Sequence, residues 1–162
     1  MTTCQVWQHR LSIVCEHTVY QGLNDKGQLG YEDTTHRGRQ ETTSGDYLPI
    51  VNLGTDFDVV DLALCAKATC VKSSTGQVKC FGENINGQLG YGDQTQRGDT
   101  AGSMGDALPF VDIGSGFSET GYHFADTFGG ANYHQCVFEE ADELLMKCWG
   151  RNVILLSNLR LH

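Results

Sequence analysis

The chain repeats part of its own sequence after 60 residues. Residues 22–54 and 82–114 are identical at 17 of 33 positions at this one offset, and both copies carry Gly-Gln-Leu-Gly-Tyr, Arg-Gly and Leu-Pro in the same order. A longer offset of 68 relates KCFGEN at 79–84 to KCWGRN at 147–152, so about eight residues are inserted in the later unit. Units of this length that contain turn residues and lack a helical period are typical of β-propeller blades.

The repeat predicts an all-β fold, namely a partial, open β-propeller of two to three four-stranded antiparallel blades. Short β-rich runs at 59–62, 77–81 and 110–113 are the predicted strands, and only 139–146 has a weak helical pattern. The predicted division is a degenerate or partial first unit at 1–21, repeat unit 1 at 22–81, repeat unit 2 at 82–149, and the start of a truncated or divergent third unit at 150–162.

Charge and hydropathy argue against two classes of partner. The net charge of −9 argues against a nucleic-acid partner, because affinity for phosphates is built from Lys and Arg. No run approaches the ~20 apolar residues that cross a bilayer, so no membrane partner is expected. The first 15 residues, MTTCQVWQHRLSIVC, lack the basic start and apolar core of a signal peptide, which predicts a non-secreted protein or a chain whose true start is missing.

Four of the seven cysteines mark predicted hairpins. CVKSSTGQVKC is symmetric about residue 75, so a three-residue loop at 74–76 would place Cys70 directly opposite Cys80, close enough for a disulfide. Cys136 and Cys148 repeat the pair with a loop two residues longer. Reduced, half-buried thiols are the alternative, while a zinc site is disfavoured because no Cys-x2-Cys pair is present. Disulfides would favour an extracellular origin, and the compartment itself stays open.

The glycine-rich block of each unit is predicted to be a structural turn. Gly87 and Gly90 bracket the turn, Leu89 gives it an apolar plug, and Asn84 can hydrogen-bond the nearby backbone. The residues assigned this structural role in the two units are Gly27, Gln28, Leu29 and Gly30, and Gly87, Gln88, Leu89 and Gly90.

The stretch CFGENINGQLGYG at 80–92 carries the signature of a known family. It resembles the regulator of chromosome condensation repeat, whose units read Cys-Trp-Gly-x-Asn-x-x-Gly-Gln-Leu-Gly-x-Gly. FGGANYHQCVF at 128–138 resembles the family's Ala-Gly-Gly-x-His-Thr-Cys-Ala strand, and 97–116 resembles the long connecting segment of its cysteine-bearing members. The resemblance covers roughly residues 20–152 and implies units that close into a seven-bladed ring.

The chain departs from that family pattern in length and at both ends. Seven units of about 60 residues need about 420 residues, so 162 residues imply a fragment or a decayed copy. Tyr20-Gln21-Gly22 stands where Cys-Phe-Gly is expected, and VILLSNLRLH at 153–162 replaces the expected turn. The open strand edges of such a chain predict self-association.

The favoured functional hypothesis is a non-enzymatic scaffold that binds an unidentified protein partner through its loops. The resemblance offers two alternatives, a guanine-nucleotide exchange factor for a small GTPase and a secreted or surface protein with disulfides. No catalytic, cofactor-binding or metal-binding residue is predicted, because the common catalytic and nucleotide-binding motifs are absent from the sequence.

Several local motifs are predicted to be structural. The Arg97-Gly98-Asp99 tripeptide resembles an adhesion signal, but unit 1 has Arg-Gly-Arg at the same place, so repeat-loop chemistry is favoured. His134 is predicted to be a hydrogen-bonded structural histidine. NDKGQLGYED at 24–33 lacks the ligand spacing of a calcium loop. The acidic residues of 139–143 are predicted to form a solvated loop, with docking of a basic partner as the alternative.

Overall fold

The computed structural model describes residues 2–6, 9–14, 17–43, 47–117, 121–125, 133–139 and 145–151. Its strands, in chain order, are β1 (Thr2–Val6), β2 (His9–Val14), β3 (His17–Gly22), β4 (Val59–Cys65), β5 (Ala68–Ser73), β6 (Val78–Gly82), β7 (Tyr122–Phe124), β8 (His134–Glu139) and β9 (Met146–Gly150). Short 3-10 helices, η1 (Glu41–Thr43) and η3 (Gly105–Ala107), lie in the connecting loops.

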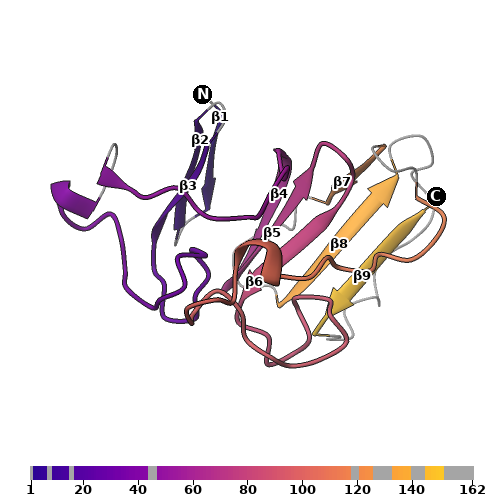
Figure 1. Ribbon diagram of the computed structural model, residues 1–162. Helices are drawn as coiled ribbons and strands as arrows, with labels where there is room; N and C mark the ends of the chain where they lie inside the picture. The colour runs from indigo at the N-terminus through magenta and orange to yellow at the C-terminus, as the bar shows by residue number, and fades with distance from the viewer. Residues whose placement is uncertain are drawn as a thin grey trace.

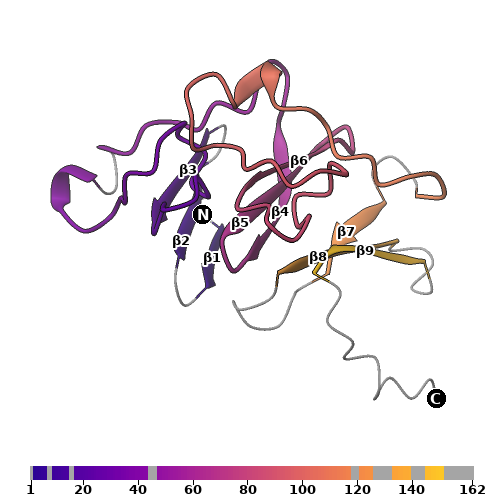
Figure 2. The same ribbon diagram turned by 90° about the horizontal axis from the view of Figure 1, so that it is seen from below.

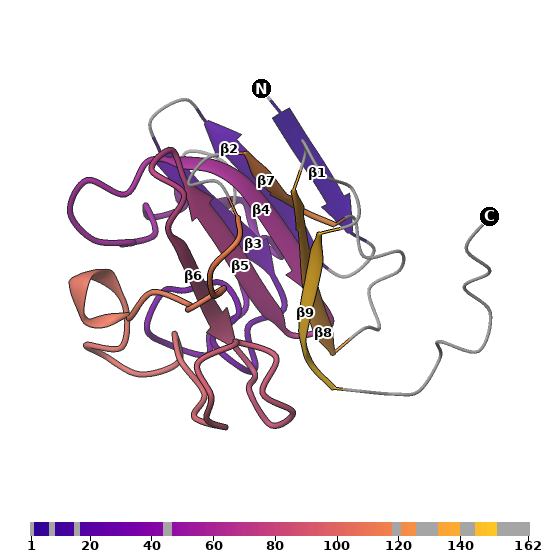
Figure 3. The same ribbon diagram turned by 90° about the vertical axis from the view of Figure 1, so that its right-hand side faces the viewer.

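The strands form antiparallel sheets that follow one another in chain order. The sheets are β1-β2-β3, β4-β5-β6 and β7-β8-β9, and each pairs neighbouring strands only. Figure 1 shows them side by side across the molecule, and Figure 3 shows the third sheet in front of the other two. The arrangement is an arc that does not close, as the all-β, open-propeller prediction requires. The limits drawn between the repeat units remain a prediction.

The strand count per sheet differs from the prediction. Within the described residues each sheet has three strands instead of four. The run 110–113, predicted as a strand, is instead an extended segment beside β6, held by one backbone hydrogen bond from Val111 N to Val78 O at 2.8 Å. Pro109 has no N–H to donate, and the Asp112 side chain bonds Gly114 N, so no ladder develops there.

The segment 139–146, which has a weak helical pattern in the sequence, is not helical at either of its ends. Glu139 ends β8 and Met146 begins β9, while 140–144 lies outside the described residues. The two strands pair across this segment, and Glu139 N donates to Leu145 O at 3.0 Å. Pairing with a neighbouring strand therefore overrides a weak local propensity.

The hairpin predicted from the symmetry about residue 75 is confirmed. Strands β5 and β6 place Cys70 opposite Cys80 and Lys72 opposite Val78. Ser73 N donates to Gln77 O at 2.8 Å, which closes a three-residue loop. Gly76 has a φ of 80°, the left-handed conformation that such loops favour in glycine.

The central sheet is buried on both faces. Every residue of β5 and β6 is buried, whereas β4 is exposed or partly exposed over its first four residues and buried at Ala63 and Cys65. One apolar cluster, which includes Tyr20, Phe81 and Leu29, lies towards the first sheet. The other, which includes Leu89 and Val137, lies towards the third sheet. Neighbouring sheets thus cover each other, as repeat architectures require.

The loops that follow β3 and β6 contact each other. In Figure 1 both descend from the ends of their strands, and in Figure 2 the segment that carries η3 runs beside the loop that follows β3. Gly105 N donates to Asn52 O at 3.1 Å, and Thr55 N donates to Asp106 Oδ1 at 2.8 Å, which joins the two loops directly. The same two loops carry the repeated turns.

Candidate functional site

One asparagine organises the turn of each unit. In unit 2, Asn84 accepts a hydrogen bond from Leu89 N at 2.9 Å and donates from Nδ2 to Asp93 O at 3.0 Å. Asn24 makes the same bonds one unit earlier, with lengths of 2.9 and 2.8 Å. The side-chain amide thus ties the first residue of the segment 84–93 both to its middle and to its last residue, which holds the turn closed.

The glutamine of each turn bonds across it. Gln88 Oε1 accepts from Asn86 N at 2.8 Å, and Gln28 Oε1 accepts from Lys26 N at the same distance. Both glutamines have no exposed surface, although glutamine is mostly a surface residue. A buried amide with satisfied bonds specifies the geometry of the turn rather than offering a free group to a ligand.

A tyrosine from each turn caps the edge of the preceding sheet. The Tyr91 hydroxyl accepts from Cys80 N at 2.8 Å and donates to Cys80 O at 3.0 Å. Tyr31 makes the equivalent pair with the backbone of Tyr20 at 2.9 and 3.0 Å. Burial raises the pKa of Tyr91 to about 12, so its hydroxyl stays protonated at neutral pH.

An arginine and an aspartate lock the next part of each loop. Arg97 donates to both carboxylate oxygens of Asp93 at 3.0 and 2.8 Å, and its guanidinium lies 4.2 Å from the centroid of the Tyr91 ring. The backbone of Arg97 also pairs with Gly82. Arg37 repeats this arrangement in unit 1, with 2.9 and 2.7 Å bonds to an aspartate. The arginine of the Arg-Gly-Asp tripeptide is therefore engaged inside the fold.

Acid is expected to weaken these ion pairs. Hydrogen bonds from Arg97 lower the pKa of the Asp93 carboxyl to about 2, and Arg37 lowers the pKa of Asp33 in the same way. An unfolded aspartate titrates at about 3.9, so the stabilisation is complete above about pH 4 and is lost as the pH falls towards 2. The carboxylates are 38% and 41% exposed, so solvent screening limits each pair to about 1 kcal/mol.

Urea unfolding of the native chain and of Asp93→Asn, from about pH 5 down to about pH 2, measures this effect. We expect the variant to be less stable at about pH 5 and to lose less stability on acidification, because one of the two titrating pairs is gone. Parallel losses in the two proteins would show that Asp93 does not carry the pH dependence.

The turn of each unit packs against the next sheet. A Cβ on Gly30 would lie 2.8 Å from Phe81 Cε2, and a Cβ on Gly90 would lie 2.7 Å from Trp149 Nε1. The Trp149 indole N–H donates to Gln88 O at 3.1 Å. Phe81, which contacts the turn of unit 1, has no N–H to donate. There, Thr69 Oγ1 donates to Gln28 O at 2.8 Å instead. The same contact is thus made by different side chains.

Two lysines hold the connecting loops against the third strands of their sheets. Lys79 Nζ donates to Leu53 O at 2.7 Å and to Gly105 O at 2.8 Å, and it lies 5.3 and 5.0 Å from the Phe57 and Phe110 rings. Burial lowers the pKa of Lys79. Lys147 Nζ likewise donates to backbone carbonyls, those of Ile113 and Ser115, in the loop between β6 and β7. Sequence reasoning missed these lysines, although both stand in the repeated Lys-Cys-aromatic-Gly motif.

Both hairpin cysteine pairs are disulfide-bonded in the structure. Cys70 and Cys80 lie directly opposite, 4.1 Å apart at Cα, and so do Cys136 and Cys148. The first pair is fully buried, whereas Cys148 is exposed. Cys65 is a buried free thiol, and burial raises its pKa to about 11.

The other motifs from the sequence show no reactive grouping. His134 begins β8 and is half-buried opposite Gly150. In the 24–33 stretch, Asp25 bonds Lys67 and Asp33 bonds Arg37. Most of the acidic run at 139–143 lies outside the described residues. Within those residues, no three His, Cys, Asp or Glu side chains are placed to hold a metal ion, and no helix is long and apolar enough to cross a membrane.

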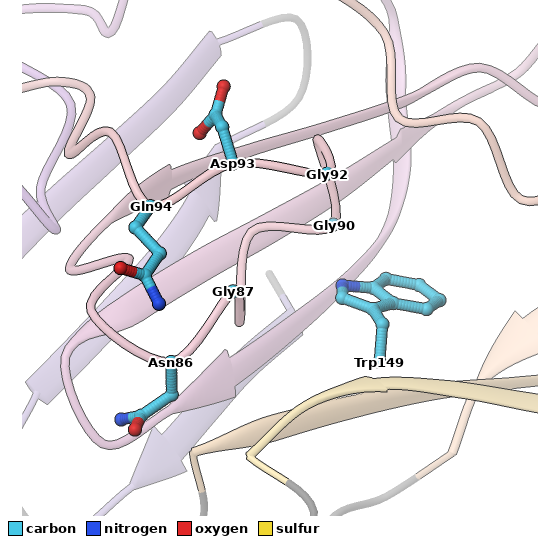
Figure 4. Close-up of a pocket in the computed structure, with 7 residues that line it drawn as sticks. All are labelled: Asn86, Gly87, Gly90, Gly92, Asp93, Gln94 and Trp149. Atoms are coloured by element: carbon cyan, nitrogen blue, oxygen red, sulfur yellow. The ribbon is translucent and has the colours of Figure 1, made fainter.

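An open hollow lies beside the turn of unit 2. It is lined by Asn86, Gly87, Gly90, Gly92, Asp93, Gln94 and Trp149. Figure 4 shows the Trp149 indole on one side of it and the amides of Asn86 and Gln94 on the other. The lining combines glycine backbone with the amides of Asn86 and Gln94, the Asp93 carboxylate and the Trp149 ring.

Known proteins match this chain in sequence and in fold. No family model matches. Protein RCC2 of Homo sapiens is 39% identical over 89 residues, which are 54% of this chain and 15% of that protein. The Danio rerio homologue of RCC2 is also 39% identical over 89 residues, with 54% and 16% covered. A chain in the crystal structure of Kap60 bound to yeast RCC1 (Prp20) is similar with a TM-score of 0.61 over 92% of this chain and 31% of its own length, at 15% identity.

These matches support the resemblance of the chain to the regulator of chromosome condensation repeat family. It spans only about one sixth of the length of the RCC2 proteins that it matches. The solved structure, at 15% identity, shows the propeller fold alone. The duplicated bonds of Asn, Gln, Tyr, Asp and Arg described above are the interactions that build each repeat unit of this chain.

Proposed function

We propose that this chain is a non-enzymatic module of propeller repeats that binds a protein partner through its loops. The supporting observation is the duplication of the loop chemistry. The polar side chains that the two units share, such as Asn84, Asp93 and Arg97, are bonded to their own unit, and so are their unit-1 equivalents. Side chains committed in this way hold a surface in shape rather than perform a reaction.

The loops also expose apolar side chains at related positions. Ile50 and Phe110 occupy the same place in the two units and are 56% and 50% exposed, and Tyr47 is 71% exposed. Their neighbours Val51 and Val111 are buried, so the backbone positions are fixed while the preceding side chains point outwards. Exposed aromatic and aliphatic residues on a rigid support are typical of protein-binding surfaces.

Affinity capture with a loop variant tests this proposal. Tyr47, Ile50 and Phe110 are changed together to serine, and the matched control changes Val60 and Met146, which are 58% and 56% exposed on strands, to serine. We expect a partner that binds the native chain and the control variant but not the loop variant. Equal capture by all three proteins would contradict a loop-borne interaction.

The alternative, nucleotide exchange on a small GTPase, is tested directly. Release of a fluorescent GDP analogue from the GTPase is followed with and without the purified chain. We expect no acceleration, because the described sheets form an open arc and an exchange factor of this family needs an intact ring face. Accelerated release would overturn the proposal of a purely scaffolding role.

A further inference from the structure

Two phenylalanine rings stack on each other beside the central sheet. The centroids of Phe57 and Phe110 are 6.3 Å apart, with an angle of 12° between the ring planes. Phe110 is 50% exposed and Phe57 is partly exposed. The central sheet itself is covered on both faces by the two apolar clusters described above. The pair therefore offers flat aromatic surface next to a sheet whose own faces are already packed.

A buried lysine holds the two rings from beneath. Lys79 Nζ lies 5.3 Å from the Phe57 centroid and 5.0 Å from the Phe110 centroid. The same ammonium donates to Leu53 O and Gly105 O, and the residue is only 2% exposed. Because its ammonium is bonded inside the fold, Lys79 fixes the platform without presenting a cation at the surface. A platform fixed in this way loses little freedom when a partner binds to it.

The two segments that carry the rings have charge of one sign. Residues 47–58 and 105–116 contain four aspartates and neither lysine nor arginine. All four aspartates are exposed, namely Asp56, Asp58, Asp106 and Asp112. Aromatic rings and carboxylates are thus combined on one surface, and this combination indicates a cationic partner.

The chain geometry places these carboxylates close to the rings. Asp56 and Asp58 are the two neighbours of Phe57 in the sequence. Asp112 follows Phe110 by two residues in an extended segment, where alternate side chains share a face. The residue between them, Val111, is buried, as this alternation requires.

Asp106 reaches the same place from the second segment. Its carboxylate accepts from Thr55 N at 2.8 Å and from Thr55 Oγ1 at 3.0 Å, two residues before Phe57. These bonds lower the pKa of the Asp106 carboxyl, so it is ionised at neutral pH. Asp106 therefore joins the two acidic segments and adds its own charge to them.

Two of the carboxylates are available to a partner. Within the described part of the chain, Asp56 and Asp58 form neither a side-chain hydrogen bond nor an ion pair. Asp56 has a φ of 56°, whereas unit 2 has Gly116 at the same place, where a left-handed backbone costs nothing. An exposed carboxylate thus occupies a position that the backbone alone would give to glycine.

We propose that this surface binds an arginine-rich segment of a protein partner. The surface, here named the aromatic–acidic surface, consists of Asp56, Phe57, Asp58, Asp106, Phe110 and Asp112. A guanidinium stacks on an aromatic ring and donates two parallel hydrogen bonds to a carboxylate, so it matches both kinds of group present. Four carboxylates outnumber the single ammonium of Lys79, which leaves the surface attractive to cations. This inference rests on the proposed function and names the chemistry of the partner.

A fluorescent peptide of alternating arginine and serine, RSRSRSRSRS, is the probe. Its anisotropy is followed as the purified chain is added at about 0.15 M salt, where the Debye length is about 8 Å and distant charges contribute little. We expect saturable binding. The same peptide with lysine should bind at least fivefold more weakly, because an ammonium has no plane to stack, and the glutamate peptide should not bind.

Variants of the chain locate the site. We expect Asp56→Asn with Asp58→Asn to weaken binding of the arginine peptide at least tenfold, and Phe110→Leu, which removes the flat ring, at least fivefold. The matched control, Glu140→Gln with Asp142→Asn, makes the same charge change in the acidic run at 139–143. It should leave binding within twofold of the native value, and circular dichroism checks that each variant is folded.

Four outcomes would overturn the proposal. They are the absence of saturable binding, equal binding of the arginine and lysine peptides, unchanged binding by the folded Asp56→Asn, Asp58→Asn chain, and an equal loss in the control. The aspartate variant keeps the test decisive if Phe110→Leu fails to fold. Failed peptide binding with loop-dependent capture would refute this inference alone. Peptide binding with equal capture by all three proteins would instead count against the proposed function.

Discussion

Replacing Gly27 with alanine is expected to destabilise the chain by about 2–5 kcal/mol, whereas the same change at Gly87 costs only about 1–2 kcal/mol. The two glycines have nearly the same backbone, with φ of 71° and 73°, so the left-handed strain of alanine is shared. Only at Gly27 does the new methyl group also meet the backbone of Gly98 and Asp99, at 2.4 Å. The difference isolates the contact between the units.

Urea unfolding of the two variants, followed by far-ultraviolet circular dichroism, measures this difference. Gly87→Ala is the matched control, because it changes the same turn in the next unit without the overlying loop. We expect the midpoint to fall much further for Gly27→Ala. Equal losses would show that Gly98 and Asp99 do not rest on the turn of unit 1.

The sequence predicted most of what is local in this fold. The symmetric string around residue 75 predicted the register of β5 and β6, because a hairpin with a glycine-containing loop has few ways to pair. The shared Gly-Gln-Leu-Gly block predicted a turn, and Asn84 hydrogen-bonds the backbone as that interpretation requires. The sequence also offered a basis for predicting the Asp93–Arg97 ion pair, since each of the two residues is repeated at the same place in unit 1.

What the sequence did not reveal depends on contacts between distant segments. The contact of Gly98 with Gly27 joins residues 71 positions apart, and no local pattern indicates it. The first unit has Tyr20 where the repeat pattern has cysteine, and its turn forms nevertheless. Tyr31 bonds the backbone N–H and C=O of that residue, so the bonds do not depend on its side chain. The Tyr20 ring packs edge-on against Phe81 at 5.9 Å.

The strand predicted at 110–113 is not formed. Its residues favour β-structure, but two local features prevent a ladder of hydrogen bonds with β6. Pro109 has no backbone N–H to donate, and the Asp112 side chain bonds Gly114 N. The fourth strand that the propeller prediction required is thus an extended segment with a single bond to β6. High β-propensity means that the side chains fit a half-buried sheet surface. It does not ensure that the backbone pairs with a neighbouring strand.

Removing either disulfide is expected to lower the free energy of unfolding by about 3 kcal/mol, since each closes a loop of 11 to 13 residues. The two bonds should differ in their resistance to reductants. Cys70 and Cys80 are fully buried, whereas Cys148 is exposed in the middle of β9. Because a thiolate must reach a sulfur atom to exchange with it, the 136–148 bond should be reduced first.

Mass spectrometry of alkylated protein after graded reduction distinguishes the two bonds. We expect Cys136 and Cys148 to be labelled while the native fold persists, and Cys70 and Cys80 only once the chain unfolds. Cys70→Ala with Cys80→Ala, and the equivalent pair at 136 and 148, give the stability losses separately. Free thiols at all four positions in material isolated without reductant would contradict the structural role of both bonds, and would remove the support for an extracellular, disulfide-bearing protein.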